Sequence, residues 1–298
     1  MSLLEVRGLR TLFRETAAVD GVDLDLAAGE TLGLVGESGC GKSTLGKTIL
    51  RLVPAASGRV AVDGADILTL GGRALAPYRR RMQMVFQDPG ASLNPRQTVR
   101  RLLETPLKVH GVEGRRGRVR AMLERVGLAD DALGRLPHEF SGGQRQRIGI
   151  ARALVLQPDL VVLDEPVSAL DLSVQAGILN LLADLKREFG LAYLFISHDL
   201  GVVRYMADRV AVMYLGRIVE TAGHAALFAG PRHPYTQALL ASVPGAPREG
   251  PRLRGELGRA GAGCRFRPRC PIAVARCATD DPALRVIAPG HLAACHLA

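Results

Sequence analysis

The sequence predicts an α/β fold: a mostly parallel sheet covered by helices, with an N-terminal antiparallel β part, a helical insertion and a small C-terminal appendage. Three observations carry this prediction. Apolar runs alternate with helical patterns in residues 31–87 and again in 158–221, as in βαβ units. Residues 88–157 have helical periodicity alone. After about residue 230, Pro, Gly and Arg become frequent, as in Pro244–Pro247 and Gly258–Gly263, which indicates a linker and a small appendage.

The individual elements follow from these patterns. Residues 1–30 are predicted to be strands with a turn at Asp20-Gly21, because Asp and Gly tolerate turn conformations. Buried strands are predicted at Thr31–Val35, Met82–Phe86, Leu160–Glu165 and Ala192–Ile196. Helices are predicted at Val99–Leu107, Val119–Val126, Gln144–Leu156 and Val174–Phe189.

A glycine-rich loop follows the first of these buried strands. It reads Gly36, Glu37, Ser38, Gly39, Cys40, Gly41, Lys42, Ser43 and Thr44, and it fits G-x-x-x-x-G-K-[ST] at every fixed position. Glycines let successive N–H groups face one anion, and the next helix adds the positive end of its dipole. We expect ATP phosphates here, with Lys42 at the β- and γ-phosphates and Ser43 ligating Mg²⁺. The alternative is an ordinary glycine-rich turn, which the flanking strand and helix disfavour.

Two acids, Asp164 and Glu165, end the predicted strand Leu160–Glu165, at the carboxyl end where ligands bind in open α/β sheets. Asp164 is placed to hold Mg²⁺ through water, and Glu165 to act as the general base that polarises the attacking water. Gln87 follows another strand, and its amide is expected to reach Mg²⁺ or the water. His198 follows a third strand, and we expect it to hydrogen-bond the γ-phosphate or Glu165. A surface acid pair and a structural histidine are the alternatives.

A second serine- and glycine-rich helix start lies about a hundred residues after the first. It reads Ser141, Gly142, Gly143, Gln144. Together with the loop, Gln87, the two acids, Ser168–Asp171 and His198, in that order, it resembles the ATP-binding-cassette family. The resemblance implies a RecA-like P-loop NTPase core. It also implies that two cassettes pack head to tail, so that Ser141, Gly143 and Gln144 contact the nucleotide of the partner and Asp171 lies across the same interface.

The sequence departs from the family pattern at one position, and the residue that stacks on adenine is not fixed by the motifs. Phe140 stands where many cassettes have Leu. The family usually stacks adenine on an N-terminal aromatic, and Phe13 is the one aromatic before the loop. Phe13 is therefore the candidate, with a plain packing role as the alternative. Cys40 is given no special role, because the family tolerates several residues there.

Composition limits the classes of function. The chain has 298 residues, 47% of them hydrophobic, enough for a large core. It has no apolar run of membrane-spanning length and no signal-peptide pattern at its start, so we expect it in the cytosol or on the cytosolic face of a membrane. The net charge is +10, but aromatics are 4% and Trp is absent. We therefore expect no nucleic-acid partner and interpret the basic residues as a solvated surface, part of it facing lipid headgroups.

Four of the five cysteines lie in the last 35 residues: Cys264, Cys270, Cys277 and Cys295. A short segment without a core is often held by a metal, and four thiolates suit an iron–sulfur cluster or zinc. Arg265, Arg267 and Arg269 are expected to offset the charge of such a cluster. A [4Fe–4S] cluster is favoured, because C-x2-C pairs are missing; zinc and unligated thiols remain alternatives.

The C-terminal residues resemble one group within the ATP-binding-cassette family. His233-Pro234-Tyr235-Thr236, the four cysteines and Gly290-His291 resemble the C-terminal region of oligopeptide/dipeptide permease ATPases. Phe86–Pro89 and Ser92–Arg96 resemble the F-type subunit of these importers. The resemblance implies a cassette domain at 1–230, with its helical subdomain at about 88–157, and a C-terminal region at 231–298. In that family at least some members hold an iron–sulfur cluster on the tail cysteines.

The implied partners are a D-type ATPase subunit in a heterodimer, two transmembrane permease subunits and, indirectly, an extracytoplasmic solute-binding protein. The implied place is the cytoplasmic face of the bacterial inner membrane. The rival is a soluble cassette ATPase of DNA repair or translation. Such proteins usually have a coiled-coil insertion or two cassettes in one chain, and this sequence shows neither.

Overall fold

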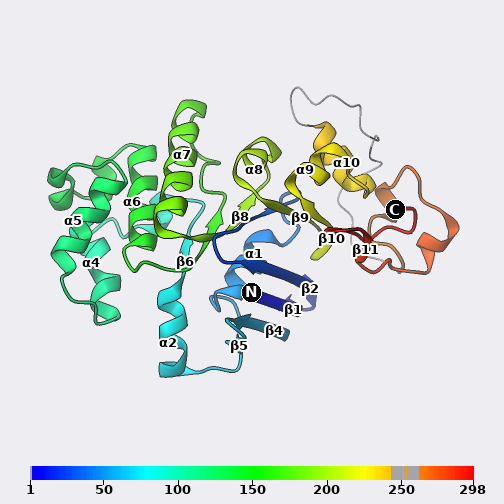
Figure 1. Cartoon of the computed structure of the whole chain (residues 1–298), viewed down its shortest axis with the longest axis horizontal. Helices are drawn as coiled ribbons and strands as arrows, with labels where there is room; N and C mark the ends of the chain where they lie inside the picture. Colours follow the sequence, from blue (N-terminus) through cyan, green and yellow to red (C-terminus); the bar gives the residue numbers. More distant parts are fainter. Residues whose placement is uncertain (1, 243–250, 252, 254–261) are drawn as a thin grey trace. The chain divides into compact units, whose positions relative to one another are not determined.

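The structure is a computed structural model that describes residues 2–242, 251, 253 and 262–298. The chain forms two compact units. Unit 1 comprises residues 1–3, 26–30 and 62–194, and unit 2 comprises residues 4–25, 31–61 and 195–298. The chain passes from unit 1 to unit 2 inside a strand, between Leu194 and Phe195. Figure 1 shows the helices and strands of both units.

The strands of the described residues are β1 (Ser2–Phe13), β2 (Thr16–Ala27), β3 (Thr31–Val35), β4 (Ser57–Val62), β5 (Ala65–Asp66), β6 (Met82–Val85), β7 (Leu160–Asp164), β8 (Ala192–Ser197), β9 (Arg209–Tyr214), β10 (Arg217–Gly223), β11 (Arg285–Ala288) and β12 (His291–Ala293). The α-helices are α1 (Lys42–Ile49), α2 (Gly72–Arg81), α3 (Pro89–Ser92), α4 (Val99–Val109), α5 (Arg115–Arg125), α6 (Gly142–Leu154), α7 (Leu172–Phe189), α8 (Leu200–Met206), α9 (His224–Ala229) and α10 (Pro234–Ala241). Short 3₁₀ turns lie at Asp130–Gly134, Pro137–Glu139, Arg267–Arg269 and Ala275–Ala278.

In unit 2, one sheet has the order β2-β1-β4, and a second has the order β11-β12-β10-β9-β3. Strands β3 and β9 are parallel, and β9 and β10 form an antiparallel hairpin. The C-terminal strands continue this sheet, because β12 pairs with β10 and β11 pairs with β12. Residues 285–288 and 291–293 therefore share a sheet with β3, the strand that leads into the glycine-rich loop.

In unit 1, β6 and β7 are parallel neighbours. Every residue of β7 is buried, as expected for a parallel strand covered on both faces. Helices α4, α5 and α6 lie side by side in Figure 1, and each has its apolar face buried. The long helix α7 ends at Gly190, whose φ of 65° gives a left-handed C-cap.

The predicted elements are largely confirmed. The strand Thr31–Val35 has the predicted bounds, and the other predicted strands and helices differ by a few residues at their ends. The predicted turn at Asp20-Gly21 is wrong: β1 turns into β2 at residues 14–15, where Arg14 has φ 54°. Asp20 and Gly21 lie inside β2, where the Asp20 N–H donates to the Gly216 carbonyl oxygen (2.9 Å); Gly21 has φ 71°, and the strand continues past it to Ala27. Pro244–Pro247 and most of Gly258–Gly263 lie outside the described residues.

Candidate functional site

The glycine-rich loop of unit 2 connects β3 to α1. Strand β3 is buried over its whole length, so its end fixes where the loop begins. Helix α1 begins at Lys42, with Gly41 as its N-cap in a left-handed conformation. No acidic side chain lies in the first turn of α1. The first N–H groups of a helix lack intrahelical partners and carry the positive end of its dipole, so this geometry suits an anion.

Two glycines of the loop are required by close contacts. Gly36 has φ 154°, and a Cβ there would lie 2.2 Å from the Met213 carbonyl oxygen. Gly41 has φ 110°, and a Cβ there would lie 2.1 Å from the Ala18 carbonyl oxygen. Any other residue at either position would displace backbone that belongs to β9 or β2. The loop therefore has a fixed path against two strands.

The Lys42 side chain folds back along the loop and is buried. Its Nζ donates to the Gly36 carbonyl oxygen (2.7 Å) and to the Glu37 carbonyl oxygen (2.9 Å). Cys40 is buried beside it, and burial raises the pKa of the thiol. A buried thiol with a raised pKa is less reactive as a nucleophile. Ser43 and Thr44 are half-buried in the first turn of α1, whereas Ser38 and Gly39 are exposed.

Two further predicted residues lie in unit 2. His198 directly follows β8 and is exposed. The next residue, Asp199, caps α8 by accepting hydrogen bonds from Gly201 N–H (2.7 Å) and Val202 N–H (3.2 Å), so the backbone around His198 is held by the helix that follows. Phe13 ends β1 with 52% of its side chain exposed. Such exposure leaves its ring accessible to a planar ligand.

The predicted acids of unit 1 lie at the end of β7. Asp164 is 2% exposed, and Glu165 is half-buried. Glu165 has φ 46°, a left-handed conformation that non-glycine residues rarely adopt. Strain of this kind persists where the surrounding structure enforces it, often at functional sites. The Gln87 amide Nε2 donates to Glu165 Oε2 (3.0 Å), so the structure joins two residues that the sequence places 78 positions apart.

The Ser-Gly-Gly-Gln segment caps helix α6 in unit 1. The Ser141 Oγ accepts from the Gln144 N–H (3.3 Å), and the Gln144 Oε1 accepts from the Ser141 N–H (3.0 Å), which is a reciprocal capping box. Both side chains are exposed. The Ser141 oxygen acts as an acceptor here, so its O–H remains able to donate to a ligand.

Gln87, Gly142 and Leu170 line one small cavity of about 100 Å³ in unit 1. This cavity brings the glutamine after β6, the start of α6 and the segment before α7 together. Asp171 is the exposed N-cap residue of α7, and its side chain makes no capping bond. The neighbouring Leu172 has 84% of its side chain exposed.

The predicted four-cysteine metal centre is not supported. All five cysteines are among the described residues, none is in a disulfide, and no group of three or more His, Cys, Asp or Glu side chains in the described part of the chain is placed to hold a metal ion. Cys264 and Cys277 meet through their backbones, because the Cys264 N–H donates to the Cys277 carbonyl oxygen (2.9 Å). The Cys295 sulfur accepts from the Leu297 N–H (3.4 Å). The donors therefore fit neither a [4Fe–4S] cluster nor zinc as arranged here.

The arginines among these cysteines have other partners. Arg265 pairs with Asp20 and donates to the Leu215 carbonyl oxygen (2.8 Å). Arg269 forms two hydrogen bonds with the Glu37 carboxylate (2.7 and 2.9 Å), and Arg267 is exposed. The expectation that these three charges offset a thiolate cluster is thus wrong for Arg265 and Arg269, because carboxylates of unit 2 already neutralise them.

The comparisons with known proteins identify the family. Residues 19–168 match the family model described as "ABC transporter", and residues 219–277 match the model of the oligopeptide/dipeptide transporter C-terminal region. The chain belongs to the ABC transporter family. Members of this family carry out ATP hydrolysis with their cassette subunits, so the chain is an ABC-type ATPase.

Similar proteins cover almost the whole of this ABC protein. A putative peptide import ATP-binding protein of Brucella ovis is 51% identical, with 98% of this chain and 97% of that protein aligned. The oligopeptide transport ATP-binding protein AppF of Bacillus subtilis is 52% identical, with 95% of this chain and 90% of that protein aligned.

Solved cassettes have the same fold. The cbiO1 protein of Clostridium perfringens, part of the ABC transporter complex cbiONQ, gives a TM-score of 0.69 at 28% identity, over 80% of this chain and 95% of that one. The cassette MJ0796, solved as a dimer in a post-hydrolysis state bound to ADP and Pi, gives a TM-score of 0.67 at 29% identity, over 74% of this chain and 98% of that one. The predicted P-loop fold class is confirmed.

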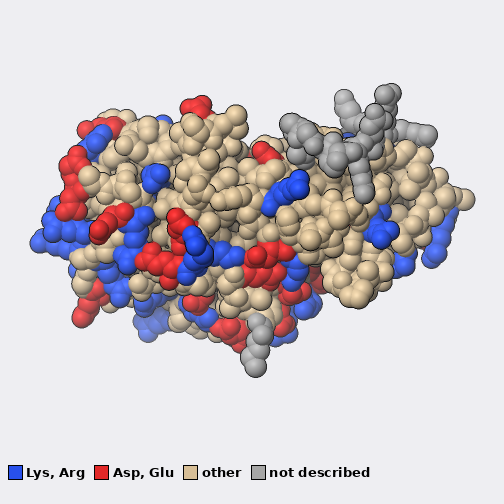
Figure 2. Space-filling view, turned by 45° about the horizontal axis from the view of Figure 1, so that its top comes forward, with Lys and Arg blue, Asp and Glu red and all other residues tan. Residues whose placement is uncertain are grey.

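Two surface properties complete the description of the ABC chain. Over the described residues, no helix combines the length and the low polarity needed to cross a bilayer. On the face drawn in Figure 2, Lys and Arg side chains lie among Asp and Glu side chains. The positive net charge is therefore mixed with acidic groups on this face.

Proposed function

We propose that this chain is the ATP-hydrolysing subunit of an importer for peptides or a related small solute. The observation that carries the proposal is the match of residues 219–277 to the oligopeptide/dipeptide transporter C-terminal region, in a chain whose 19–168 segment matches the ABC cassette. The proposed division is a cassette at 1–230, with its helical subdomain at about 88–157, and a C-terminal region at 231–298. The names of the relatives from Brucella and Bacillus support peptides as the solute.

In the proposed site, the loop Gly36–Thr44 binds the triphosphate of ATP through its N–H groups. The buried Lys42 ammonium exchanges its two carbonyl partners for phosphate oxygens. Glu165 takes the proton of the attacking water, and Gln87, already hydrogen-bonded to it, orients the carboxylate. His198 acts on the γ-phosphate, and Phe13 stacks on the adenine. Catalysis of this kind is mainly positioning and charge stabilisation.

The proposed metal ligands are the Ser43 hydroxyl, the Asp164 carboxylate and the Gln87 amide oxygen. Hard oxygen donors of this kind suit Mg²⁺, which also takes phosphate oxygens and water. When bound, Mg²⁺ would neutralise charge that develops on the phosphates.

The proposed working form is a pair of cassettes, in which Ser141, Gly143 and Gln144 contact the nucleotide held by the partner. The exposed helix start at Ser141 and the 84% exposed Leu172 beside Asp171 support such an interface. The dimeric cassette MJ0796 supports it by analogy. The second subunit is proposed to be a D-type ATPase, which makes the pair a heterodimer.

The remaining partners follow from an importer role. Two transmembrane permease subunits would receive the motion of the cassettes, and the cavity beside Gln87 supports a docking place for one of their helices. A solute-binding protein outside the membrane would select the solute. The chain would then be held peripherally on the cytoplasmic face of the bacterial inner membrane.

Uptake of a labelled tripeptide tests the proposal. A strain lacking this gene is complemented with the wild-type chain or with Glu165→Gln, and uptake is measured in intact cells. We expect uptake to return with the wild-type chain alone. Equal peptide uptake in the deletion strain and both complemented strains would show that the solute is not a peptide of this kind.

A further inference from the structure

The C-terminal region of the chain contacts the glycine-rich loop directly within unit 2. Arg269 lies in the 3₁₀ turn Arg267–Arg269, and its guanidinium forms a two-pronged ion pair with the Glu37 carboxylate (2.7 and 2.9 Å). The Arg269 side chain is 9% exposed and that of Glu37 is 30% exposed. Paired geometry of this kind is specific to arginine and carboxylate. The bond to Glu37 raises the pKa of Arg269, which therefore stays charged.

A second contact to the same loop residue comes from α10. The Glu37 N–H donates to the Tyr235 hydroxyl oxygen (2.8 Å). Tyr235 is fully buried, with its ring against Tyr214 and Phe266 at centroid distances of 4.8 and 5.6 Å. Both the backbone and the side chain of Glu37 are thus held by residues that follow the ABC core in sequence.

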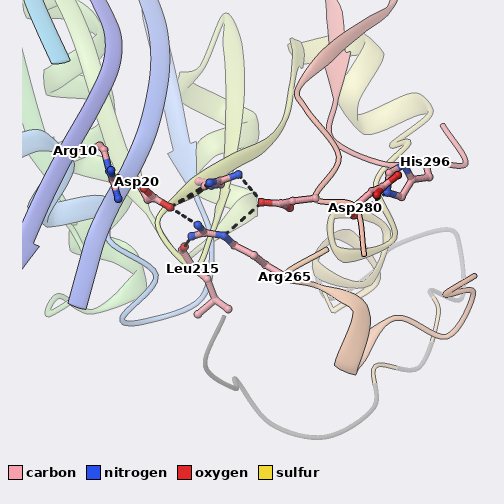
Figure 3. A network of polar contacts seen from close by, with 8 residues as sticks. Arg10, Asp20, Leu215, Arg265, Asp280 and His296 are labelled. Atoms are coloured by element: carbon pink, nitrogen blue, oxygen red, sulfur yellow. Dashed lines mark hydrogen bonds and ion pairs between the residues drawn. The ribbon is translucent and has the colours of Figure 1, made fainter. Parts of the chain in front are cut away.

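A third contact reaches the other side of the loop. Arg265 donates to the Leu215 carbonyl oxygen (2.8 Å), and the adjacent Gly216 N–H donates to the Cys40 carbonyl oxygen (2.9 Å). Asp20 anchors Arg265 and is also paired with Arg10 and Arg217. Figure 3 shows this network, in which Arg265 lies between Asp20 and the Leu215 carbonyl. Arg265 and Arg269 are four residues apart, so one short segment contacts the loop directly at Glu37 and is linked to Cys40 through Leu215 and Gly216.

We propose that Arg269 and Tyr235 are positioning residues for ATP binding, which act through Glu37. The inference rests on the proposed role of Gly36–Thr44 as the ATP site. A loop that is held before the nucleotide arrives loses less conformational freedom on binding. Arg269 also neutralises a carboxylate that would otherwise face a triphosphate at close range. The C-terminal region thereby sets the affinity of the cassette for ATP.

The test is the dissociation constant for ATP, measured by titration calorimetry in the non-hydrolysing Glu165→Gln background. We expect Arg269→Gln to raise this constant about tenfold, the size expected for loss of a hydrogen-bonded charge pair. The matched control is Arg267→Gln, which removes the same charge two residues away from an exposed position and leaves the constant unchanged. With Glu165 intact, Arg269→Gln should raise KM for ATP while kcat at saturating ATP stays within about twofold.

A double-mutant cycle separates positioning from general stability. If Arg269 acts through Glu37, adding Arg269→Gln to Glu37→Gln changes the ATP constant by less than about twofold. Tyr235→Phe removes only the hydroxyl that Glu37 uses, and we expect it to raise the constant about threefold. If Arg269→Gln does not fold, Tyr235→Phe alone tests whether the contact with Glu37 affects ATP binding.

Two results would overturn the inference. One is a dissociation constant for ATP that stays at the wild-type value in the folded variants Arg269→Gln and Tyr235→Phe. The other is an Arg269→Gln substitution that raises the dissociation constant for ATP by the same factor in the wild-type and in the Glu37→Gln background. Lys42→Ala is measured in parallel: if it abolishes binding while the Arg269 and Tyr235 variants bind normally, only the positioning role fails. If Lys42→Ala also binds normally, the assignment of the ATP site fails first.

Discussion

At the scale of single residues, Glu165 at the end of β7 is held in an unusual conformation. Glu165 combines a left-handed backbone with a hydrogen bond from Gln87. Strain of this kind persists where the surrounding structure enforces it. A general base needs this kind of fixed orientation, because proton transfer requires hydrogen-bond reach to the water.

Replacing Glu165 with Gln tests that role. The amide keeps the size of the side chain but cannot accept the proton, so we expect ATP hydrolysis to fall by about 10²-fold or more while ATP binding remains. Phosphate release and nucleotide titration measure the two effects. Glu124→Gln, on an exposed position of α5, is the matched control. Near-normal turnover of Glu165→Gln would exclude the base assignment.

Replacing Lys42 with Ala tests the phosphate loop. The buried ammonium donates to two loop carbonyl oxygens, so its loss should weaken ATP binding about tenfold or more, as expected for charge-assisted hydrogen bonds. Equilibrium titration with ATP measures the change. Lys47→Ala, in the last turn of the same helix, should leave affinity unchanged. Equal affinity of the Lys42 variant and the wild type would contradict the assignment.

At the scale of elements, α10 depends on a neutral histidine. His233 is its N-cap residue, and its Nδ1 accepts from the Tyr235 N–H (3.1 Å). The ring is 2% exposed, and burial lowers its pKa from 6.5 to about 4. The His233 N–H donates to the buried Glu220 carboxylate (2.9 Å), which also bonds His291 (2.7 Å). Protonation of Nδ1 would remove the acceptor that holds the backbone of Tyr235.

This histidine predicts a dependence of stability on pH. Between about pH 6.5 and 4 the unfolded chain binds a proton at residue 233 and the folded chain does not, so the free energy of unfolding falls as the pH falls. The full loss from this group is on the order of 3 kcal/mol. Urea unfolding at several pH values measures it. His233→Asn keeps an N-cap acceptor without titrating and should have a shallower slope over this range; equal slopes would contradict the prediction.

The elements also show how far sequence reasoning reaches. Buried strands such as Thr31–Val35 were predictable because a run of about five mostly apolar residues is short for a helix and favours a covered strand. The turn at Asp20-Gly21 was wrongly predicted because local composition does not reveal that Asp20 bonds Gly216.

In the candidate site, too, local motifs were predictable from the sequence and tertiary contacts were not. The spacing of Gly36–Thr44 indicates an anion loop, but the contact of Arg269 with Glu37 joins residues 232 positions apart. His233–Thr236 was recognised as a motif, and its contact with the loop was not, since no local pattern encodes a tertiary partner. The four tail cysteines suggested a metal cluster with arginines that offset its charge, whereas Arg265 and Arg269 pair with distant carboxylates.

At the scale of the whole molecule, the account requires two cassettes. Ser141→Arg tests this in a pair of this chain with its second subunit. A long cation at the exposed start of α6 should block hydrolysis at the site of the partner while this chain still binds ATP at its own loop. Nucleotide titration measures ATP binding at the loop of this chain. Glu165→Gln in this chain silences hydrolysis at its own site, so that the remaining turnover reports the site of the partner. Loss of binding at both sites would count against action across the interface.

The same scale includes the membrane partners, whose presence the central claim requires. The most direct measurement is affinity purification of the tagged chain from detergent-solubilised membranes of its host, with co-purifying proteins identified by mass spectrometry. The account predicts two polytopic membrane proteins and a second cassette subunit in the purified complex. Recovery of the chain from the soluble fraction alone, together with ribosomes or nucleic acid, would contradict it.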